Sequence, residues 1–275
     1  MDFTPTERSL DLTGRLLDFM RDFVYPAEQV YARQRREGDL HRLPPVVAEL
    51  QAEARARGLW NLFLRDQRWG AGLTNLEYAP LAEISGRSPV IAPEAMNCSA
   101  PDTGNMELLA EFGTADQQQR WLRPLLEAEI RSCFCMTEPD VASSDPTRLA
   151  TTLRREGDVL VVDGRKWWST GTADPRCRLA IVVGVSDPDA DPHRRHSLVL
   201  VPLEAPGVEV CGTCPRSATA SSTGTARSAS PASGYRPPAC SGRPAAGSPS
   251  PRRASARDAS TTACGPSAWP SGPSS

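Results

Sequence analysis

The chain has 275 residues, enough for one or two domains with a hydrophobic core. Lysine and arginine number 31 and aspartate and glutamate 33, so the formal net charge of -2 gives no overall attraction to nucleic acid or to an anionic membrane. The N-terminus has no basic segment followed by an apolar run, and no stretch approaches the roughly 18 consecutive apolar residues of a spanning helix. We therefore expect a soluble, cytoplasmic protein without a signal peptide that binds neither nucleic acid nor membrane.

The N-terminal part, residues 1–130, has the pattern of a helical domain. After Thr6, apolar residues recur at helical spacing on a broad face. Pro44 and Pro45 are placed to open a second helix at its first turn, and Gly58 is placed to end it. Amphipathic helices joined by short loops bury their apolar faces against one another, so we expect a helical bundle.

Two capping boxes mark further helix starts in this part of the chain. Thr74 is followed three residues later by Glu77, and Thr114 by Gln117, each ahead of an apolar run. Gly113 is a stop signal for the helix before the second box. The sequence thus predicts helices that begin after Thr74 and after Thr114.

From residue 131 the pattern changes to that of β-strands. The segment 159–169 carries two β-rich runs around Asp163-Gly164, which predicts a β-hairpin. Two more β-rich runs follow at 179–185 and 197–203. We expect residues 131–210 to form a small β-barrel or sandwich, incomplete at its C-terminal side.

The predicted fold class is therefore α+β, an N-terminal helical bundle followed by a β domain. Helices and strands do not alternate, and no Gly-x-Gly-x-x-Gly loop occurs. If the protein binds a dinucleotide, the site is not a Rossmann crevice.

The eight cysteines do not suggest a disulfide framework or a metal site. Four of them, Cys98, Cys133, Cys135 and Cys177, are scattered through an ordinary globular pattern and are interpreted as free buried thiols, and the other four, Cys211, Cys214, Cys240 and Cys264, lie in the C-terminal tail. Cys211 and Cys214 form a Cys-x-x-Cys pair, but no second pair follows at zinc spacing. Asp191, His193 and His196 lie in a polar loop that we interpret as solvated. No metal ligand is predicted.

Residues 211–275 differ in composition from the rest of the chain. They contain no Leu, Ile, Val, Phe or Met and are rich in Ser, Ala, Pro, Gly, Thr and Arg. Such a segment cannot bury enough apolar surface to offset the entropy of ordering it. We expect a low-complexity, disordered tail.

The first segment with a chemical signature runs from Phe134 to Asp145. It reads as a strand that enters a turn rich in small residues. Backbone N–H groups and the hydroxyls of Thr137, Ser143 and Ser144 could hold an anion or the polar edge of a ring.

The second segment, residues 163–171, places two adjacent tryptophans on a strand. Period-two alternation predicts that Trp167 and Trp168 point to opposite faces, one inward and one outward. An outward indole offers a plane for stacking a flat ligand. The alternative is that both are ordinary core tryptophans, since buried aromatic residues are common.

Together the two segments resemble the flavin-binding segments of acyl-CoA dehydrogenases. The family pattern is aromatic-x-x-Thr-Glu-Pro with small residues and Ser-Asp after it, then Asn/Asp-Gly-x-Lys-x-Trp-Ile-Thr/Ser. Met136 to Asp145 resembles the subgroup named family members ten and eleven. The resemblance extends over residues 1–210 and includes Trp121 to Leu126. Asp140 stands where the family has Gly, and Trp-Ser-Thr stands where it has Trp-Ile-Thr.

The resemblance implies FAD as the cofactor and an acyl-CoA as the substrate. The implied FAD contacts lie along the two segments at Phe134, Met136, Thr137, Trp168, Ser169 and Thr170. Trp168 would pack on the isoalloxazine, with Ser169 and Thr170 at its N5 side. Ser143 would touch the pantetheine or phosphate end of the acyl-CoA.

By the same resemblance the protein is an FAD-dependent oxidoreductase of fatty acid metabolism that dehydrogenates the α,β bond of an acyl-CoA thioester. Electron-transferring flavoprotein would accept the electrons, and the intact family implies a homo-oligomer. The carboxylate base of the family lies in a C-terminal helical domain, so no catalytic residue is assigned and we expect a truncated, inactive chain. The alternatives are a non-catalytic flavin or acyl-CoA binding module with a disordered tail, and a scaffold without a cofactor.

The tail has a second interpretation at the level of codons. A shifted reading frame joins the third base of each codon to the first two bases of the next codon. In that frame, the codons of Arg257 to Ser274 can encode Gly-Arg-Ile-His-His-Cys-Met-Arg-Ala-Ile-Gly-Met-Ala-Glu-Arg-Ala-Leu. This hidden sequence is an amphipathic helix that resembles the start of the family's C-terminal domain. Trp269 has a single codon, and its step to Pro270 forces the Ala. We favour a frameshift near residue 210 over a natural tail.

Overall fold

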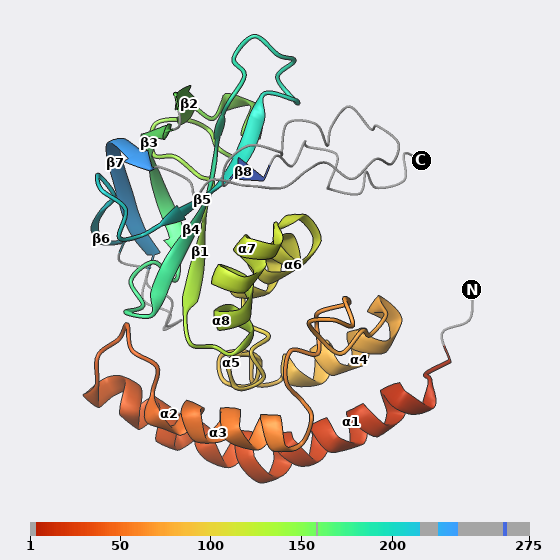
Figure 1. The fold of residues 1–275 in the computed structure, drawn as a ribbon. Helices are drawn as coiled ribbons and strands as arrows, with labels where there is room; N and C mark the ends of the chain where they lie inside the picture. Colours follow the sequence, from red (N-terminus) through yellow and green to blue (C-terminus); the bar gives the residue numbers. More distant parts are fainter. Residues whose placement is uncertain (1–3, 158, 215–224, 236–260, 263–275) are drawn as a thin grey trace. The chain divides into compact units, whose positions relative to one another are not determined.

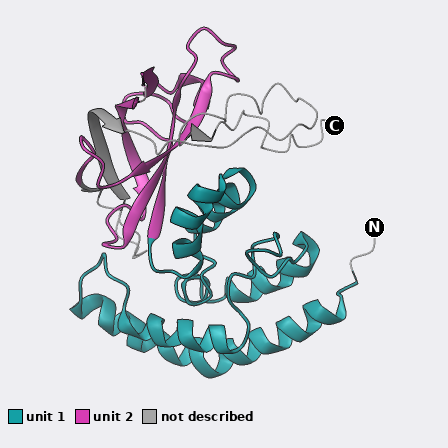
Figure 2. Ribbon diagram, in the orientation of Figure 1, with its two compact units in different colours: residues 1–130, 217–223 teal, residues 131–216, 224–275 magenta. Residues whose placement is uncertain are grey.

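The computed structural model describes four stretches of the chain, residues 4–157, 159–214, 225–235 and 261–262. It divides into two compact units, and the chain passes from the first to the second between Ile130 and Arg131 (Figure 2). The first unit holds the helices and the second holds the strands (Figure 1). Helices precede strands without alternating with them, which confirms the predicted α+β class.

The first unit is built from helices joined by short loops. In chain order they are α1 (Glu7–Phe19), the π-helical turn η1 (Met20–Val24), α2 (Tyr25–Glu37), α3 (Pro45–Ala56), α4 (Asn75–Ser85), α5 (Ala92–Ala95), α6 (Asp102–Phe112), α7 (Ala115–Gln117), the π-helical turn η2 (Gln118–Leu122) and α8 (Arg123–Leu126). The elements α1, η1 and α2 follow one another without a break and form one long curved run (Figure 1).

Both predicted capping boxes are present. The Thr74 hydroxyl accepts a hydrogen bond from the Glu77 backbone N–H while the Glu77 carboxylate accepts one from the Thr74 N–H, and Thr114 and Gln117 make the same exchange. These contacts satisfy N–H groups that the first helical turn leaves without partners. Gly113 ends α6 as predicted.

Side-chain amides and an indole hydrogen-bond to the C-terminal end of α8 in the first unit. Asn97 has no exposed surface, and its Nδ2 donates to Asn61 Oδ1 at 2.8 Å and to the carbonyl of Leu125 at 3.0 Å. Asn61 Nδ2 in turn donates to the carbonyl of Leu126 at 3.0 Å, and Trp60 Nε1 donates to the same oxygen at 2.8 Å. These side chains satisfy carbonyls that α8 leaves open at its C-terminal end.

The second unit is a β-sheet. Its strands are β1 (Arg131–Cys135), β2 (Thr152–Glu156), β3 (Val159–Thr170), β4 (Cys177–Val185), β5 (His196–Pro202), β6 (Glu209–Cys214), β7 (Thr225–Tyr235) and β8 (Thr261–Thr262), with a 3-10 turn, η3 (Pro146–Arg148), before β2. The order of hydrogen-bonded neighbours is β6-β7-β3-β2-β4-β5-β8, and β1 pairs with β4 in parallel. Leu153, Val162, Val182 and Val199 are among the buried side chains of its core.

The predicted hairpin around Asp163-Gly164 is wrong. β3 continues through both residues, and the hairpin is formed by β2 and β3, with Glu156 paired to Val159 across a turn at Gly157. Gly164 is needed for a different reason, because a Cβ there would lie 2.7 Å from Thr151 Cβ and would overlap Thr151 Oγ1. The glycine therefore permits a close approach of two segments and does not make a turn.

This close approach predicts a loss of stability in Gly164→Ala. The added methyl group has no room beside Thr151, so we expect the free energy of unfolding to fall by about 1–3 kcal/mol. Gly14→Ala is the matched control, since nothing lies within 4 Å of a Cβ there and Gly14 is inside α1. The control should raise stability by about 0.5–1 kcal/mol. Urea denaturation measures the change in the free energy of unfolding of each variant. Changes of the same sign in the two variants would contradict the packing argument.

Part of the predicted tail is strand in the structure. β7 pairs with β3 and β6, and β8 pairs with β5, whereas the sequence predicts no ordered structure after residue 210. Backbone pairing explains this difference, because an open sheet edge binds a strand through main-chain groups whatever its side chains are. Residues 215–224, 236–260 and 263–275, including most of the hidden frame, lie outside the described residues.

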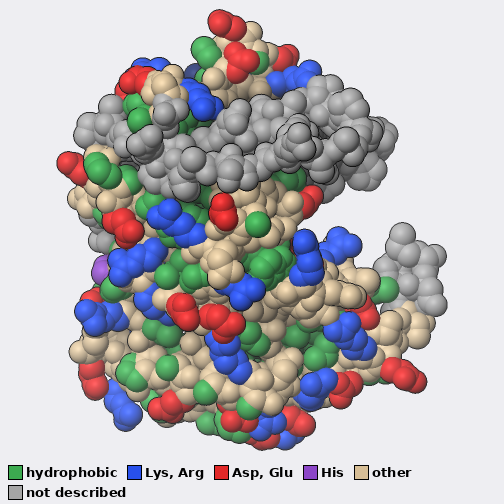
Figure 3. All heavy atoms as spheres, in the orientation of Figure 1, with side chains coloured by type: hydrophobic (Ala, Val, Ile, Leu, Met, Phe, Trp, Pro, Cys, Tyr) green, Lys and Arg blue, Asp and Glu red, His purple; other side chains and the backbone are tan. Residues whose placement is uncertain are grey.

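Charged side chains are interspersed on the visible face of the molecule. Lys and Arg alternate with Asp and Glu on the surface that Figure 3 shows. This distribution fits the formal net charge of -2. Among the described residues, no helix is both long and apolar enough to cross a membrane.

Candidate functional site

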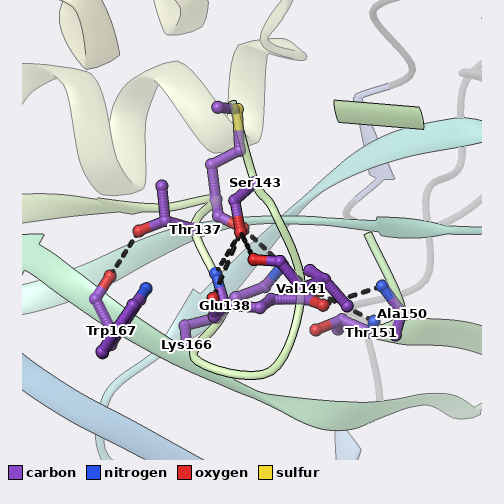
Figure 4. A network of polar contacts seen from close by, with 9 residues as sticks. Thr137, Glu138, Val141, Ser143, Ala150, Thr151, Lys166 and Trp167 are labelled. Carbon is purple, nitrogen blue, oxygen red and sulfur yellow. Dashed lines mark hydrogen bonds and ion pairs between the residues drawn. The ribbon is translucent and has the colours of Figure 1, made fainter. Parts of the chain in front are cut away.

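The two motif segments meet inside the second unit. The first begins in the last residues of β1 and continues into the loop after it, and the second is the C-terminal part of β3 (Figure 4). The Thr137 hydroxyl donates to the Trp167 carbonyl at 2.6 Å, and the Trp167 N–H donates to the Thr137 carbonyl at 3.0 Å. These two bonds fix the backbone of one segment against the other.

A buried ion pair lies directly beside this contact. Lys166 Nζ donates to Glu138 Oε1 at 2.7 Å and to the carbonyl of Met136 at 2.9 Å. Both side chains are nearly inaccessible, with 3% of Lys166 and 5% of Glu138 exposed. The Glu138 carboxylate also accepts the backbone N–H groups of Ala150 at 2.7 Å and of Thr151 at 2.9 Å. One carboxylate thus joins three separate segments.

The electrostatics of the pair follow from burial and hydrogen bonding. Burial raises the pKa of Glu138, but the bonds from Lys166, Thr151 and the Ala150 N–H outweigh it, and the net pKa lies below the usual value. Burial lowers the pKa of Lys166, and the Glu138 carboxylate opposes that shift. Three donors on two carboxylate oxygens favour the ionised form of Glu138.

The lowered pKa of Glu138 predicts an acid-dependent loss of stability. A carboxyl whose pKa is lower in the folded state contributes stability above its unfolded pKa of about 4.3 and loses it as the pH falls through the folded value. Glu138→Gln should therefore show a smaller drop in stability between neutral pH and about pH 3. Denaturant unfolding at both pH values measures this, with the exposed Glu156→Gln as control. An unchanged drop in Glu138→Gln would contradict the assignment.

Ser143, which the resemblance implies as a contact to the acyl-CoA, bonds to the backbone of its own turn. Its side chain is buried, its Oγ accepts the Glu138 N–H at 2.8 Å, and it donates to the carbonyl of Glu138 or of Val141, both at 3.2 Å. The hydroxyl therefore holds the turn together, and a contact to an acyl-CoA stays a prediction. Ser144, the next residue, is exposed.

Trp168 has an unusual backbone. Its φ is +55°, in the left-handed region that a bulky residue rarely adopts. The pairing with β7 shows why, since the three steps from Lys166 to Ser169 face only two steps from Ser228 to Ala226. The strand therefore carries a bulge here. The Trp168 side chain remains 45% exposed.

This bulge overturns the predicted alternation of the two tryptophans. Their ring centroids lie 5.9 Å apart with a 59° angle between the planes, so the rings contact each other and do not point to opposite faces. The extra residue breaks the period of two between Trp167 and Trp168. Trp167 is half-buried and Trp168 is the exposed ring.

The other predicted flavin contacts differ in the solvent exposure of their side chains. Phe134, on β1 opposite Ile181, is half-buried, as are Met136, Thr137 and Thr170. Ser169 is fully buried, and its hydroxyl has no hydrogen-bond partner among the described residues. An exposed indole and an unsatisfied polar group on one strand fit a flat ligand with a polar edge. No group of three or more metal-ligating side chains comes together in the described part of the chain.

Sequence reasoning missed the pair of Glu138 and Lys166. Both residues lie within the two motif segments, but the interpretation assigned them no role. A signal existed, because a charged residue inside an apolar strand is buried at high cost unless it has a partner. Lys166 lies inside such a strand, and Glu138 is an acidic residue of the other motif.

Two family models match this chain. The model described as acyl-CoA dehydrogenase, N-terminal domain, matches residues 7–129, and the model described as acyl-CoA dehydrogenase, middle domain, matches residues 133–227. The chain belongs to the acyl-CoA dehydrogenase family. The resemblance seen in the two motif segments is thereby confirmed.

Known acyl-CoA dehydrogenases are similar over most of this chain. FadE2 of Mycobacterium tuberculosis, named a probable acyl-CoA dehydrogenase, is 52% identical over 217 residues, which make up 78% of this chain and 53% of FadE2. Acyl-CoA dehydrogenase family member 10 of Mus musculus is 47% identical over 204 residues, 72% of this chain and 19% of that protein. The chain spans about half the length of FadE2 and a smaller part of family member 10.

Solved acyl-CoA dehydrogenases share the fold. A protein of Mycobacterium abscessus assigned to this activity is 44% identical with a TM-score of 0.80, over 85% of this chain and 60% of that one. A glutaryl-CoA dehydrogenase of Mycobacterium smegmatis in complex with FADH2 has a TM-score of 0.64 at 20% identity, over 84% of this chain and 54% of that one. At that identity the second likeness shows the fold alone.

Proposed function

We propose that this chain supplies the N-terminal and middle domains of an FAD-dependent acyl-CoA dehydrogenase that forms the α,β double bond of an acyl-CoA thioester. Family membership supports an oxidoreductase that acts on acyl-CoA. The observation that carries the FAD assignment is the exposed Trp168 indole, whose preceding residue, Trp167, is bonded to Thr137 through both its N–H and its carbonyl. An exposed aromatic ring on a fixed strand is suited to stacking against an isoalloxazine.

The residues that we propose to bind FAD contact different parts of the flavin ring. Trp168 would cover one face of the ring, and Met136 and Thr137 would line its polar edge. The Thr137 hydroxyl already donates to the Trp167 carbonyl, so it is left to accept a hydrogen bond. The flavin, when bound, would accept the hydride from the β-carbon of the substrate. We assign no base to the described residues, because the resemblance places the family's carboxylate base in a C-terminal helical domain.

The proposed partners follow from the family. The substrate would be an acyl-CoA, with Ser143 or its exposed neighbour Ser144 near the pantetheine or phosphate end. Electron-transferring flavoprotein would accept the electrons, and the complete enzyme would be a homo-oligomer. A cytoplasmic location, action in fatty acid metabolism and the inactivity of the chain by itself stay predictions.

Trp168→Ala tests the FAD assignment. In a protein whose frame is restored after residue 210, the change should weaken FAD binding by about 1–3 kcal/mol, because a stacking partner and its buried area are lost. FAD titration followed by flavin absorption measures this. Trp60→Ala is the control, since that ring contacts Arg55 in the first unit and should leave FAD affinity unchanged. Unchanged affinity in Trp168→Ala would refute the assignment.

A second candidate function is a flavin or acyl-CoA binding module without catalysis. The chain spans only about half the length of FadE2, and none of its described residues is assigned as the base. Sequencing the DNA that encodes residues 205–215 separates the two candidates. If the DNA sequence shifts the reading frame near residue 210 so that it encodes the hidden helix, the enzyme is supported. If the DNA encodes residues 211–275 as given, the binding module is supported.

A further inference from the structure

Trp168 is held in its exposed position at a cost in backbone energy. A left-handed φ of +55° brings the Cβ of any residue other than glycine close to its own carbonyl, and bulky residues pay most. Such an outlier persists only where neighbouring contacts fix the chain on both sides. Contacts within the second unit supply this constraint at Trp168.

The chain is fixed on both sides of Trp168. On the C-terminal side, Ser169 and Thr170 pair with β7. On the N-terminal side, Trp167 is bonded to Thr137 through both its N–H and its carbonyl. Lys166, one residue earlier, binds Glu138 and the carbonyl of Met136.

The Glu138 carboxylate makes that N-terminal side rigid. It is anchored by the backbone N–H groups of Ala150 and Thr151 as well as by Lys166, so it cannot turn away without leaving buried donors unpaired. Ser143 additionally bridges the N–H of Glu138 to the loop. A shift of Lys166 along β3 would break its contacts with Glu138 Oε1 and with the Met136 carbonyl (Figure 4).

We propose that Glu138 and Lys166 are positioning residues that hold Trp168 in its strained, exposed conformation and so present the indole to the flavin. This inference rests on the proposed function for the identity of the ligand. The strain itself does not depend on the ligand, because it is a property of the free chain. The pair acts through Met136, Thr137 and Trp167, and neither side chain needs to touch the flavin.

The experiment compares glycine with alanine at Trp168 in the 275-residue chain. Glycine in an ordinary strand is less stable than alanine, but at a left-handed φ the order is reversed. We expect Trp168→Gly to melt at a higher temperature than Trp168→Ala. Arg165 is the matched control, exposed on the same strand without a positive φ. There Arg165→Gly should melt at a lower temperature than Arg165→Ala.

The role of the ion pair is tested by repeating the comparison in the double variant Glu138→Gln, Lys166→Met, which leaves no unpaired buried charge. If the pair holds the bulge, the advantage of glycine over alanine at Trp168 disappears in this background. In the frame-restored protein, the double variant with Trp168 intact should also bind FAD about 10-fold more weakly, although its melting temperature stays near that of the frame-restored parent. A merely structural role would move the affinity and the melting temperature together.

Two outcomes would overturn the proposal. One is the same order of glycine and alanine at Trp168 as at Arg165, and the other is an undiminished glycine advantage in the double variant. If the double variant does not fold, Thr137→Val serves as the background, because it removes the hydroxyl bond to Trp167 and keeps the side-chain shape. If the frame-restored protein takes up no FAD while the stability pattern holds, the proposed function fails and the positioning of Trp168 stands.

Discussion

Lys166→Met should lower the free energy of unfolding of the β domain by about 3–5 kcal/mol, because it leaves the Glu138 carboxylate buried without its counter-ion. The methionine fills most of the volume of the lysine stem, so the loss reports the missing charge and not a cavity. Guanidinium denaturation followed by tryptophan fluorescence measures it.

The control for this prediction is a surface pair on the neighbouring strand. Arg154 and Glu156 on β2 are 3.9 Å apart and more than half exposed. Arg154→Met should change stability by less than about 0.5 kcal/mol. A loss in Lys166→Met no larger than that of the control would mean that Glu138 finds other compensation, from water or from protonation.

Asn97→Ala should destabilise the helical domain by about 2–4 kcal/mol. The substitution removes the donor to Asn61 Oδ1 and to the Leu125 carbonyl inside the protein, where water cannot replace it. It also places a Cβ without a compensating amide at a φ of +55°, where asparagine is tolerated better than alanine.

Thermal unfolding monitored by circular dichroism measures the effect of Asn97→Ala. Asn75→Ala is the matched control, since Asn75 is exposed at the first turn of α4. It should stay within about 0.5 kcal/mol of the parent chain. Equal losses in the two variants would show that the buried amide contributes no more than a surface one.

The sequence predicted the elements that depend on local chemistry. The capping boxes at Thr74 and Thr114 were confirmed because each involves residues three positions apart whose geometry the helix itself sets. The strands β4 and β5 were found because their apolar runs are continuous.

The errors lie where distant segments meet. Asp163-Gly164 has the composition of a turn, but the glycine is required by Thr151 on another segment. The alternation of Trp167 and Trp168 failed because β7 pairs around the bulge. The pair of Glu138 and Lys166 was missed for the same reason, since its energy depends on burial that no local pattern reports.

The parallel pairing of β1 with β4 has a consequence for the order in which the β domain folds. The hairpins β2-β3 and β4-β5 pair strands that are adjacent in the sequence. β1 pairs with β4, and β2 and β3 lie between these two strands in the sequence. Contacts between distant segments carry a larger loop-closure entropy and form later. Because Met136 and Thr137 follow β1 directly, they cover the indole pair on β3 only once β1 has paired with β4. A chaperone that recognises exposed aromatic rings would meet the domain before that pairing.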